Sequence, residues 1–275
     1  MDAFAAKYVV FIEDKTGSHA RALLDLMDSY PNALQHFVWK QTAASGQYTI
    51  AKQRGYKVWG YFMDGSNGQF ERYARRFDYL GIYHGASDDD MKALVGYGLP
   101  VICWEIHTRW MRERVLALGI QGLMCSNYPY VSSNVAQASR DDFGSGLRAA
   151  GDLPWVLGWK YQPLLVSEAK ALRVDSGSTT GYTLGSLGPI GKDEYTIAFG
   201  MRWPDALPDG NAHAGVAFGL ADDQPYRANV PGAVGGYHLV VHVTGQVELF
   251  RRTPGGDAGE SLAAFDTRPQ LQVSG

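Results

Sequence analysis

The sequence predicts an α/β fold followed by an all-β fold within one chain of 275 residues. Up to about residue 130, buried-strand patterns alternate with segments of helical spacing, an order typical of a parallel sheet. From about residue 169 the helical spacing stops and short strands with alternating apolar residues follow. We therefore predict an incomplete (β/α)8 TIM-type barrel, with about six of its eight units, and then an antiparallel jelly-roll-like sandwich.

The first half contains six apolar runs that are typical of buried strands. They span residues 8–12, 34–39, 57–63, 79–83, 100–106 and 122–125. Apolar stripes at helical spacing lie between them: Ala20, Leu23, Leu24 and Met27 in one segment, and Phe70, Tyr73, Ala74 and Phe77 in another. Residues 108–118 form a third helical segment, which Gly119 ends, and Asp88 begins a fourth. An open doubly wound sheet is the alternative to the barrel.

The second half contains four runs that alternate as strands do. They span residues 195–203, 214–219, 237–243 and 246–250, and Thr244-Gly245 makes a tight hairpin between the last two. We place the barrel domain at residues 1–160 and the sandwich at residues 161–275. Residues 271–275 read as the start of a further strand, so we expect the sandwich to be incomplete at its C-terminus.

Composition excludes several classes of protein. With 45% hydrophobic and 19% charged residues, the chain can bury a core. A net charge of −3 and the lack of a basic stripe argue against a nucleic-acid partner. We find no signal peptide and no apolar run of the roughly 20 residues that a transmembrane segment needs. Cys103 and Cys125 lie in apolar runs, where free thiols are expected. The compartment stays open: a secreted or cell-surface protein and a cytoplasmic one both agree with the sequence.

Three segments of the first half occur in an order and spacing known from one enzyme family. The first is Ile12-Glu13-Asp14-Lys15, the second is residues 101–106 around Trp104, and the third is residues 118–129. Together they resemble the I-E-x-K, V-x-V-W-T-V and L-G-V-D-G-I-I-T-D-x-P segments of the glycerophosphodiester phosphodiesterase family. The resemblance covers about the first 130 residues and implies a phosphoric diester hydrolase of glycerophospholipid metabolism, which releases glycerol 3-phosphate and an alcohol.

The resemblance also implies roles for individual residues. Glu13 corresponds to a carboxylate that binds a divalent metal ion, Ca²⁺ or Mg²⁺. Lys15 lies two residues further along the strand, hence on the same face, and corresponds to a phosphate-binding lysine. Trp104 corresponds to the aromatic residue that lines the substrate pocket. The chain departs from the family at Glu105, where the family has threonine, and at Ser126-Asn127, where it has Thr-Asp. These departures put the preference for glycerol in doubt.

In that family the I-E-x-K strand is the third of eight. The resemblance therefore predicts that this chain is a fragment without the first two strands, which carry two further metal-binding acids and the catalytic histidines of an H-R-G and an H-D motif. Neither motif occurs in the sequence, so we identify no catalytic residue and expect weak or no turnover. Two alternatives remain: a carbohydrate- or surface-binding module on a catalytically inactive barrel, and a complete non-catalytic protein closed by dimerisation.

Further candidate residues follow from their positions at strand ends. Lys40 and His84 are candidate substrate contacts, and His107 is a weaker one. Asp88 to Asp90 fit helix capping better than a cation site. In the sandwich, aromatic residues and a histidine are candidates for a glycan platform, although such residues also build cores: Trp203, Tyr226, Tyr237 and His213.

Overall fold

A computed structural model describes most of the first half of the chain and parts of the second. The described residues are 8–106, 108–125, 128–132, 164–166, 171–173, 194, 196–203, 213–220, 235–253 and 259–267. The chain divides into two compact units, Met1–Ile106 with Met111–Cys125, and His107–Trp110 with Ser126–Gly275. The predicted domain boundary at residue 160 lies outside the described residues and stays a prediction.

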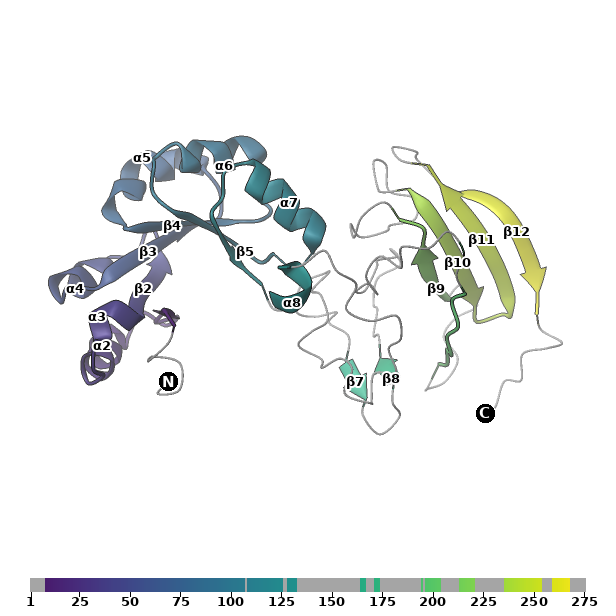
Figure 1. Cartoon of the computed structure of the whole chain (residues 1–275), viewed down its shortest axis with the longest axis horizontal. Coiled ribbons are helices and arrows are strands. Elements are labelled where there is room, and N and C mark those ends of the chain that lie inside the picture. Colours follow the sequence, from purple (N-terminus) through teal and green to yellow (C-terminus); the bar gives the residue numbers. More distant parts are fainter. Residues whose placement is uncertain are drawn as a thin grey trace. The chain divides into compact units, whose positions relative to one another are not determined.

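The first unit is built on a curled, six-stranded parallel sheet that resembles half of a barrel (Figure 1). Its strands are β1 (Val10–Ile12), β2 (Phe37–Thr42), β3 (Lys57–Phe62), β4 (Tyr79–Tyr83), β5 (Val101–Trp104) and β6 (Gly122–Met124). They lie side by side in the order of the sequence. A doubly wound sheet reverses its strand order at a switch point, so this alternative is wrong for the six strands. Closure into a full barrel stays a prediction.

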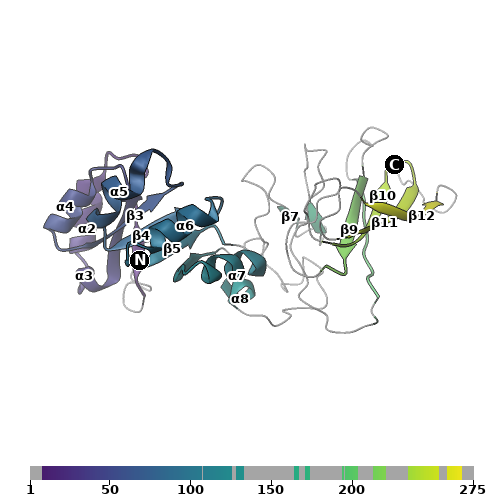
Figure 2. The ribbon, with the colours of Figure 1, turned by 90° about the horizontal axis from the view of Figure 1, so that it is seen from above.

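Helices connect these strands and follow the outside of the curled sheet (Figures 1 and 2). They are α2 (Ala20–Asp28), α3 (Ala33–His36), α4 (Tyr48–Gln53), η1 (Ser66–Gly68), α5 (Gln69–Tyr73), η2 (Ala74–Arg76), α6 (Asp88–Val95) and α7 (Arg109–Ala117). The predicted apolar stripes are largely buried, with Leu24 and Met27 in α2 and Phe70 in α5. This packing forms the core between the sheet and its helices.

The two faces of the parallel sheet carry different side chains: one face packs against the helices and the other is the inner face of the half-barrel. A Cβ atom on Gly60 would lie 2.3 Å from the ring of Phe77, so this position of β3 faces the helices. A Cβ atom on Gly81 would lie 2.4 Å from Nε1 of Trp59, so Trp59 lies across β4 on the opposite, inner face. Because side chains alternate along a strand, Tyr61 is also on the inner face. Lys40 is paired with Trp59 and shares that face.

The structure corrects some boundaries in this unit. Residues 34–36, predicted as the start of a strand, belong to the short helix α3. This helix follows Asn32, which takes a left-handed conformation and accepts a hydrogen bond from the backbone N–H of Gln35 (2.9 Å). Strand β2 therefore begins later and runs to Thr42, so Lys40 lies within it and not at its end. Helix α4 was not predicted at all.

The second unit contains an antiparallel sheet of four strands in the order β12-β11-β10-β9. These are β9 (His213–Phe218), β10 (Gly236–His242), β11 (Gln246–Arg252) and β12 (Glu260–Asp266). The predicted hairpin is confirmed, with Gly245 at φ 87° and its N–H donating to the carbonyl of His242 (2.9 Å). The described six-stranded parallel sheet and separate four-stranded antiparallel sheet agree with the prediction of an α/β region followed by a β region. The jelly-roll topology stays a prediction.

In the rest of the second unit, one predicted strand is wrong and several elements were missed. Residues 196–203, predicted as a strand, form no strand, since they are largely exposed and no described strand pairs with them. Strand β12 was missed, and so were the paired strands β7 (Leu164–Val166) and β8 (Ala171–Arg173) and the helix α8 (Tyr128–Val131). Residues 271–275 lie outside the described residues. In the described ranges, every helix is too short or too polar to span a bilayer.

Candidate functional site

A cluster of charged and aromatic side chains occupies the inner face of the half-barrel, toward the carboxyl ends of its strands. Glu13 and Lys15 follow β1, Lys40 comes from β2, Tyr61 from β3 and Trp104 from β5. The carboxyl ends of parallel strands meet at one edge of a sheet, so residues distant in sequence come together there. The structure thus brings together four residues that the sequence singled out, Glu13, Lys15, Lys40 and Trp104, and adds Tyr61, which it did not.

Glu13 is the centre of this cluster. Its Oε2 atom lies 2.9 Å from Nζ of Lys40 and 3.0 Å from Nζ of Lys15. Its Oε1 atom accepts a hydrogen bond from the Tyr61 hydroxyl at 2.6 Å. Both carboxylate oxygens therefore have strong donors, two of them positively charged. One carboxylate and two ammonium groups leave the cluster with a single net positive charge.

These contacts keep Glu13 ionised. Burial alone would raise the pKa of the Glu13 carboxyl, but hydrogen bonds from Tyr61, Lys40 and Lys15 outweigh it and hold that pKa below its ordinary value. Burial and the Glu13 carboxylate also raise the pKa of the Tyr61 hydroxyl far above its ordinary value. The phenol therefore stays protonated and remains a donor at any physiological pH.

The two lysines differ in how firmly they are held. The Lys40 side chain is 17% exposed, and its Nζ atom lies 5.2 Å from the ring centre of Trp59 and 5.3 Å from that of Tyr61. The Lys15 side chain is 73% exposed and contacts the Tyr61 ring at 5.8 Å. Ion pairs as exposed as that of Lys15 add little stability. Lys40 is therefore a fixed ammonium group, whereas Lys15 can leave Glu13 at little cost.

Aromatic rings continue the cluster along the inner face. The Tyr61 ring meets the Trp104 ring edge-on, with ring centres 5.2 Å apart, and Tyr83 lies 6.1 Å from Trp104. Trp59 is fully buried beneath Lys40 and contacts Phe11 at 5.1 Å. Trp59 and Tyr61 were not identified as candidate residues from the sequence, although both fall in the predicted strand 57–63. Their spacing of two residues, with aromatic side chains on one face near the strand end, was the available signal.

His84 contributes to the fold more clearly than to the cluster. Its ring lies 4.3 Å from that of Tyr83, and its backbone N–H donates to the carbonyl of Trp104 (2.7 Å). Its Nδ1 atom is buried and has no hydrogen-bond partner among the described residues. Burial lowers the pKa of this imidazole, so it is neutral at pH 7. Because its side chain contacts the cluster only through the Tyr83 ring among the described contacts, and its hydrogen bond to Trp104 is made by the backbone, His84 is a weaker candidate than Lys40.

Asp14 organises the loop that carries Lys15. Its Oδ1 atom accepts the backbone N–H groups of Thr16 (3.1 Å) and Gly17 (3.0 Å), and its Oδ2 atom accepts that of His19 (2.7 Å). These bonds fix the turn between β1 and α2. Asp14 therefore holds its own loop and also accepts a hydrogen bond from the Gln47 side chain (3.3 Å), whereas Glu13 contacts Lys15 and Lys40.

The cluster fits an anion better than a divalent cation. A metal ion needs several oxygen or nitrogen donors with free lone pairs, whereas both oxygens of Glu13 are already accepting hydrogen bonds. No group of three or more histidine, cysteine or acidic side chains in the described ranges could hold a metal ion. The charged groups that lie beside Glu13 are the ammonium groups of Lys15 and Lys40. Ammonium groups attract phosphate or carboxylate.

The other predicted candidates do not join this cluster. His107 and Tyr226 lie outside the described residues. Asp88 to Asp90 lie in the first turn of α6, which Ser87 caps, and Asp88 pairs with Arg114 (2.6 Å). In the antiparallel sheet, Tyr237 is paired with Phe218 and His213 with His242. Residues 237 and 242 are five apart in β10, so Tyr237 and His213 lie on opposite faces and do not form one platform.

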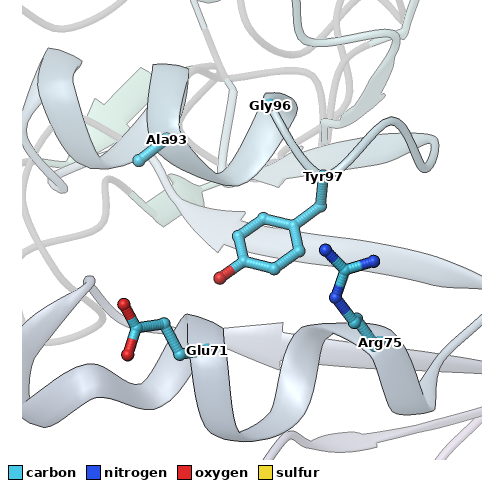
Figure 3. A pocket seen from close by; sticks show the side chains of 5 residues that line it. All are labelled: Glu71, Arg75, Ala93, Gly96 and Tyr97. Atoms are coloured by element: carbon cyan, nitrogen blue, oxygen red, sulfur yellow. The ribbon is translucent and has the colours of Figure 1, made fainter.

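A shallow depression of about 380 Å³ lies on the outer side of the unit, between α5 and α6. Figure 3 shows Glu71 of α5 and Arg75 of η2 facing Tyr97, which lies just beyond the end of α6. The Arg75 guanidinium lies 5.6 Å from the Tyr97 ring centre. None of the predicted site residues lines this depression, which leaves the inner-face cluster as the candidate site.

Comparison with known proteins does not add to this geometry, because no protein-family model and no curated protein matches the chain.

Proposed function

We propose that the inner-face cluster binds a phosphodiester and that the chain acts on glycerophosphodiesters, in the manner of glycerophosphodiester phosphodiesterases. The observation that carries the proposal is the pair of ammonium groups of Lys15 and Lys40 beside the rings of Tyr61 and Trp104. Lysine ammonium groups bind phosphate oxygens as point charges. The aromatic rings offer apolar surface to the glycerol or alcohol part of such a ligand.

Each residue has a distinct task in this proposal. Lys40, fixed on Trp59 and Tyr61, supplies a positive charge in a set position. Lys15, largely exposed, closes on the second phosphate oxygen. Hydrolysis of a phosphodiester then requires a group that accepts a proton from water and one that donates a proton to the departing alkoxide. The histidines that would do so in the H-R-G and H-D motifs do not occur in these 275 residues, so we expect slow or no turnover.

The resemblance assigns a divalent metal ion to Glu13. The groups around Glu13 do not fit that ion as they lie, because the two oxygens are held by Tyr61, Lys15 and Lys40. Any Ca²⁺ or Mg²⁺ at this position would have to displace at least one ammonium group first.

Binding and turnover of glycerophosphocholine test the proposal. We expect measurable binding by calorimetry, weak or no release of glycerol 3-phosphate with Ca²⁺ or Mg²⁺, and loss of binding in Lys40→Met. Lys57→Met is the matched control, since Lys57 also lies over a tyrosine ring of this sheet (Tyr79, 5.8 Å) but begins its strand. Equal loss in both variants would reject the site. Fast hydrolysis that Glu13→Ala abolishes would reject the expectation of weak turnover.

A second candidate function is glycan binding by the antiparallel sheet. Tyr237 is 38% exposed and stacks on Phe218, with ring centres 5.5 Å apart and an angle of 17° between the planes. Exposed aromatic rings are common at recognition surfaces. A glycan array probed with the whole chain tests this function: binding that is lost in Tyr237→Ala and kept in Lys40→Met supports it, and absence of any binding rejects it.

A further inference from the structure

The arrangement at Glu13 differs from the one that a metal-dependent site requires. A carboxylate that binds a metal ion presents its oxygens to the cation and is supported by further acids or histidines. Here the oxygens of Glu13 are presented to Lys15, Lys40 and the Tyr61 hydroxyl. The carboxylate thus holds two positive charges in place at the inner face.

We infer that Glu13 is the internal counter-ion of a metal-independent anion site, and that an incoming phosphate group competes with Glu13 for the ammonium groups. This inference rests on the proposed function, in that it takes the cluster to be the ligand site. It changes the role of Glu13 from a ligand of a cation to a group that positions Lys40 and restrains Lys15.

Burial supports this division of roles. The side chain of Glu13 is only 11% exposed and that of Lys40 only 17%, so neither charge is well solvated. A charge so placed needs a partner, because an unpaired buried charge is costly. In the free protein that partner is Glu13 for Lys40. Lys15 is 73% exposed and is well solvated without Glu13, so it is the ammonium group that an anion recruits first.

The two roles of Glu13 predict opposite effects of Glu13→Gln. If Glu13 holds a metal ion that binds the phosphate, then removing its charge weakens phosphate binding. If Glu13 is a counter-ion, then removing its charge takes away a repelling and competing carboxylate. The glutamine keeps the size of the side chain and still accepts a hydrogen bond from Tyr61. We expect binding to tighten by about fivefold, the effect of one unit charge at about 4 Å in water.

The experiment measures binding of inorganic phosphate and of glycerophosphocholine to the whole chain by calorimetry, in excess EDTA and again in excess Ca²⁺. We expect the same affinity in both buffers, tighter binding in Glu13→Gln and at least tenfold weaker binding in Lys40→Met. Glu71→Gln is the matched control, since it removes the same charge from the outer depression and should leave binding unchanged. Thermal unfolding of each variant shows that it is folded.

The outcomes separate this inference from the proposed function. Binding that requires Ca²⁺ and is lost in Glu13→Gln would overturn the counter-ion role and leave the proposed function standing. Binding of inorganic phosphate in EDTA that Glu13→Gln tightens, without binding of glycerophosphocholine, would support the counter-ion role and overturn the proposed function. Absence of binding of either probe in both buffers would overturn both.

Discussion

The half-barrel and the antiparallel sheet are stabilised in different ways. In the half-barrel, several large side chains are fully buried, with Trp39 and Trp59 at 0% exposure. Among the described side chains of β9 to β12, only Val240 and Arg252 are buried, and most others are half-buried or exposed. The half-barrel is therefore held by a core between strands and helices that are neighbours in sequence, whereas the described sheet shows pairing between strands and much less core.

The two regions also hold their ionisable groups differently. Glu13 of the half-barrel is kept charged by donors on both oxygens. In the antiparallel sheet, His213 and His242 have ring centres 5.4 Å apart, and His242 lies 2.7 Å from Glu248. Burial, together with the nearby His213, lowers the pKa of His238 to about 4. His84 of the half-barrel is also a buried, neutral imidazole, but its pKa is lowered less than that of His238, so acid should affect the antiparallel sheet more strongly.

The largest expected effect is that of Trp59→Ala in the half-barrel. The indole is fully buried, and removing it leaves a cavity beneath Lys40 and beside Phe11. We expect the free energy of unfolding to fall by about 3–5 kcal/mol. Urea unfolding gives the size of the change, and hydrogen exchange should accelerate in residues 8–125 but not in residues 236–252. The control is Met124→Ala, on an exposed side chain, which should cost about 0.5 kcal/mol or less. Faster exchange in both regions would show that they unfold together.

A smaller effect separates the two faces of the half-barrel. A Cβ atom on Gly60 would clash with Phe77 on the outer face, and one on Gly81 would clash with Trp59 on the inner face. We expect Gly60→Ala and Gly81→Ala each to cost about 1–3 kcal/mol, because overpacking forces side chains to move. Only Gly81→Ala should also weaken phosphate binding, since it displaces the ring that supports Lys40. Equal effects on binding would show that the faces are not independent.

This contrast between the regions explains what could be predicted from sequence. Helix α6 begins at Asp88 and strand β4 spans Tyr79–Tyr83, as predicted, because caps and buried runs act over a few residues. Strand β12 was missed, and residues 196–203 were wrongly predicted as a strand. A strand of an antiparallel sheet needs a partner, and a local pattern of alternation does not show whether one exists.

The site was predictable only in part for a related reason. Glu13, Lys15, Lys40 and Trp104 were chosen from strand positions and from the family resemblance, and the structure places them in one cluster. The hydrogen bond from Tyr61 to Glu13 joins residues 48 apart in sequence, and no spacing rule gives it. The contact of Glu13 with Lys40 depends in turn on the pairing of β1 with β2, which the sequence pattern does not give. The sequence therefore identified the residues but not the contacts by which Lys15, Lys40 and Tyr61 surround Glu13.

Acid should act more strongly on the antiparallel sheet than on the half-barrel. The pKa of His238 is about 4 in the folded chain, whereas an unfolded histidine has a pKa near 6.5, so the unfolded state binds more protons between these values. The contribution of neutral His238 to the free energy of unfolding is therefore complete above about pH 6.5. It falls as the pH drops toward 4, by at most about 1.4 kcal/mol per pH unit. Glu13 has a lowered pKa, so its contribution is lost only at more acidic pH.

Hydrogen exchange at several pH values measures this difference. Exchange in residues 236–252 should accelerate more between pH 6.5 and 4 than exchange around residues 57–62, because the pKa of His84 is lowered less than that of His238. In His238→Leu, the pH dependence of residues 236–252 should flatten. His213→Asn should flatten it less, because burial has the larger effect on the His238 pKa. Equal acceleration of both regions over this pH range would contradict the expected difference.

The smallest expected effect tests how local the folding of the half-barrel is. The Ser87 side chain caps α6 by accepting a hydrogen bond from the backbone N–H of Asp90 at 3.1 Å. We expect Ser87→Ala to lower the free energy of unfolding by about 1 kcal/mol, since this N–H then loses its partner. Ser87→Asn restores an acceptor and should stay within a few tenths of a kcal/mol of the wild type. Urea unfolding distinguishes the two. If Ser87→Ala costs nothing, then the three carboxylates that follow are enough to start the helix, and its start is set by charge and not by the cap.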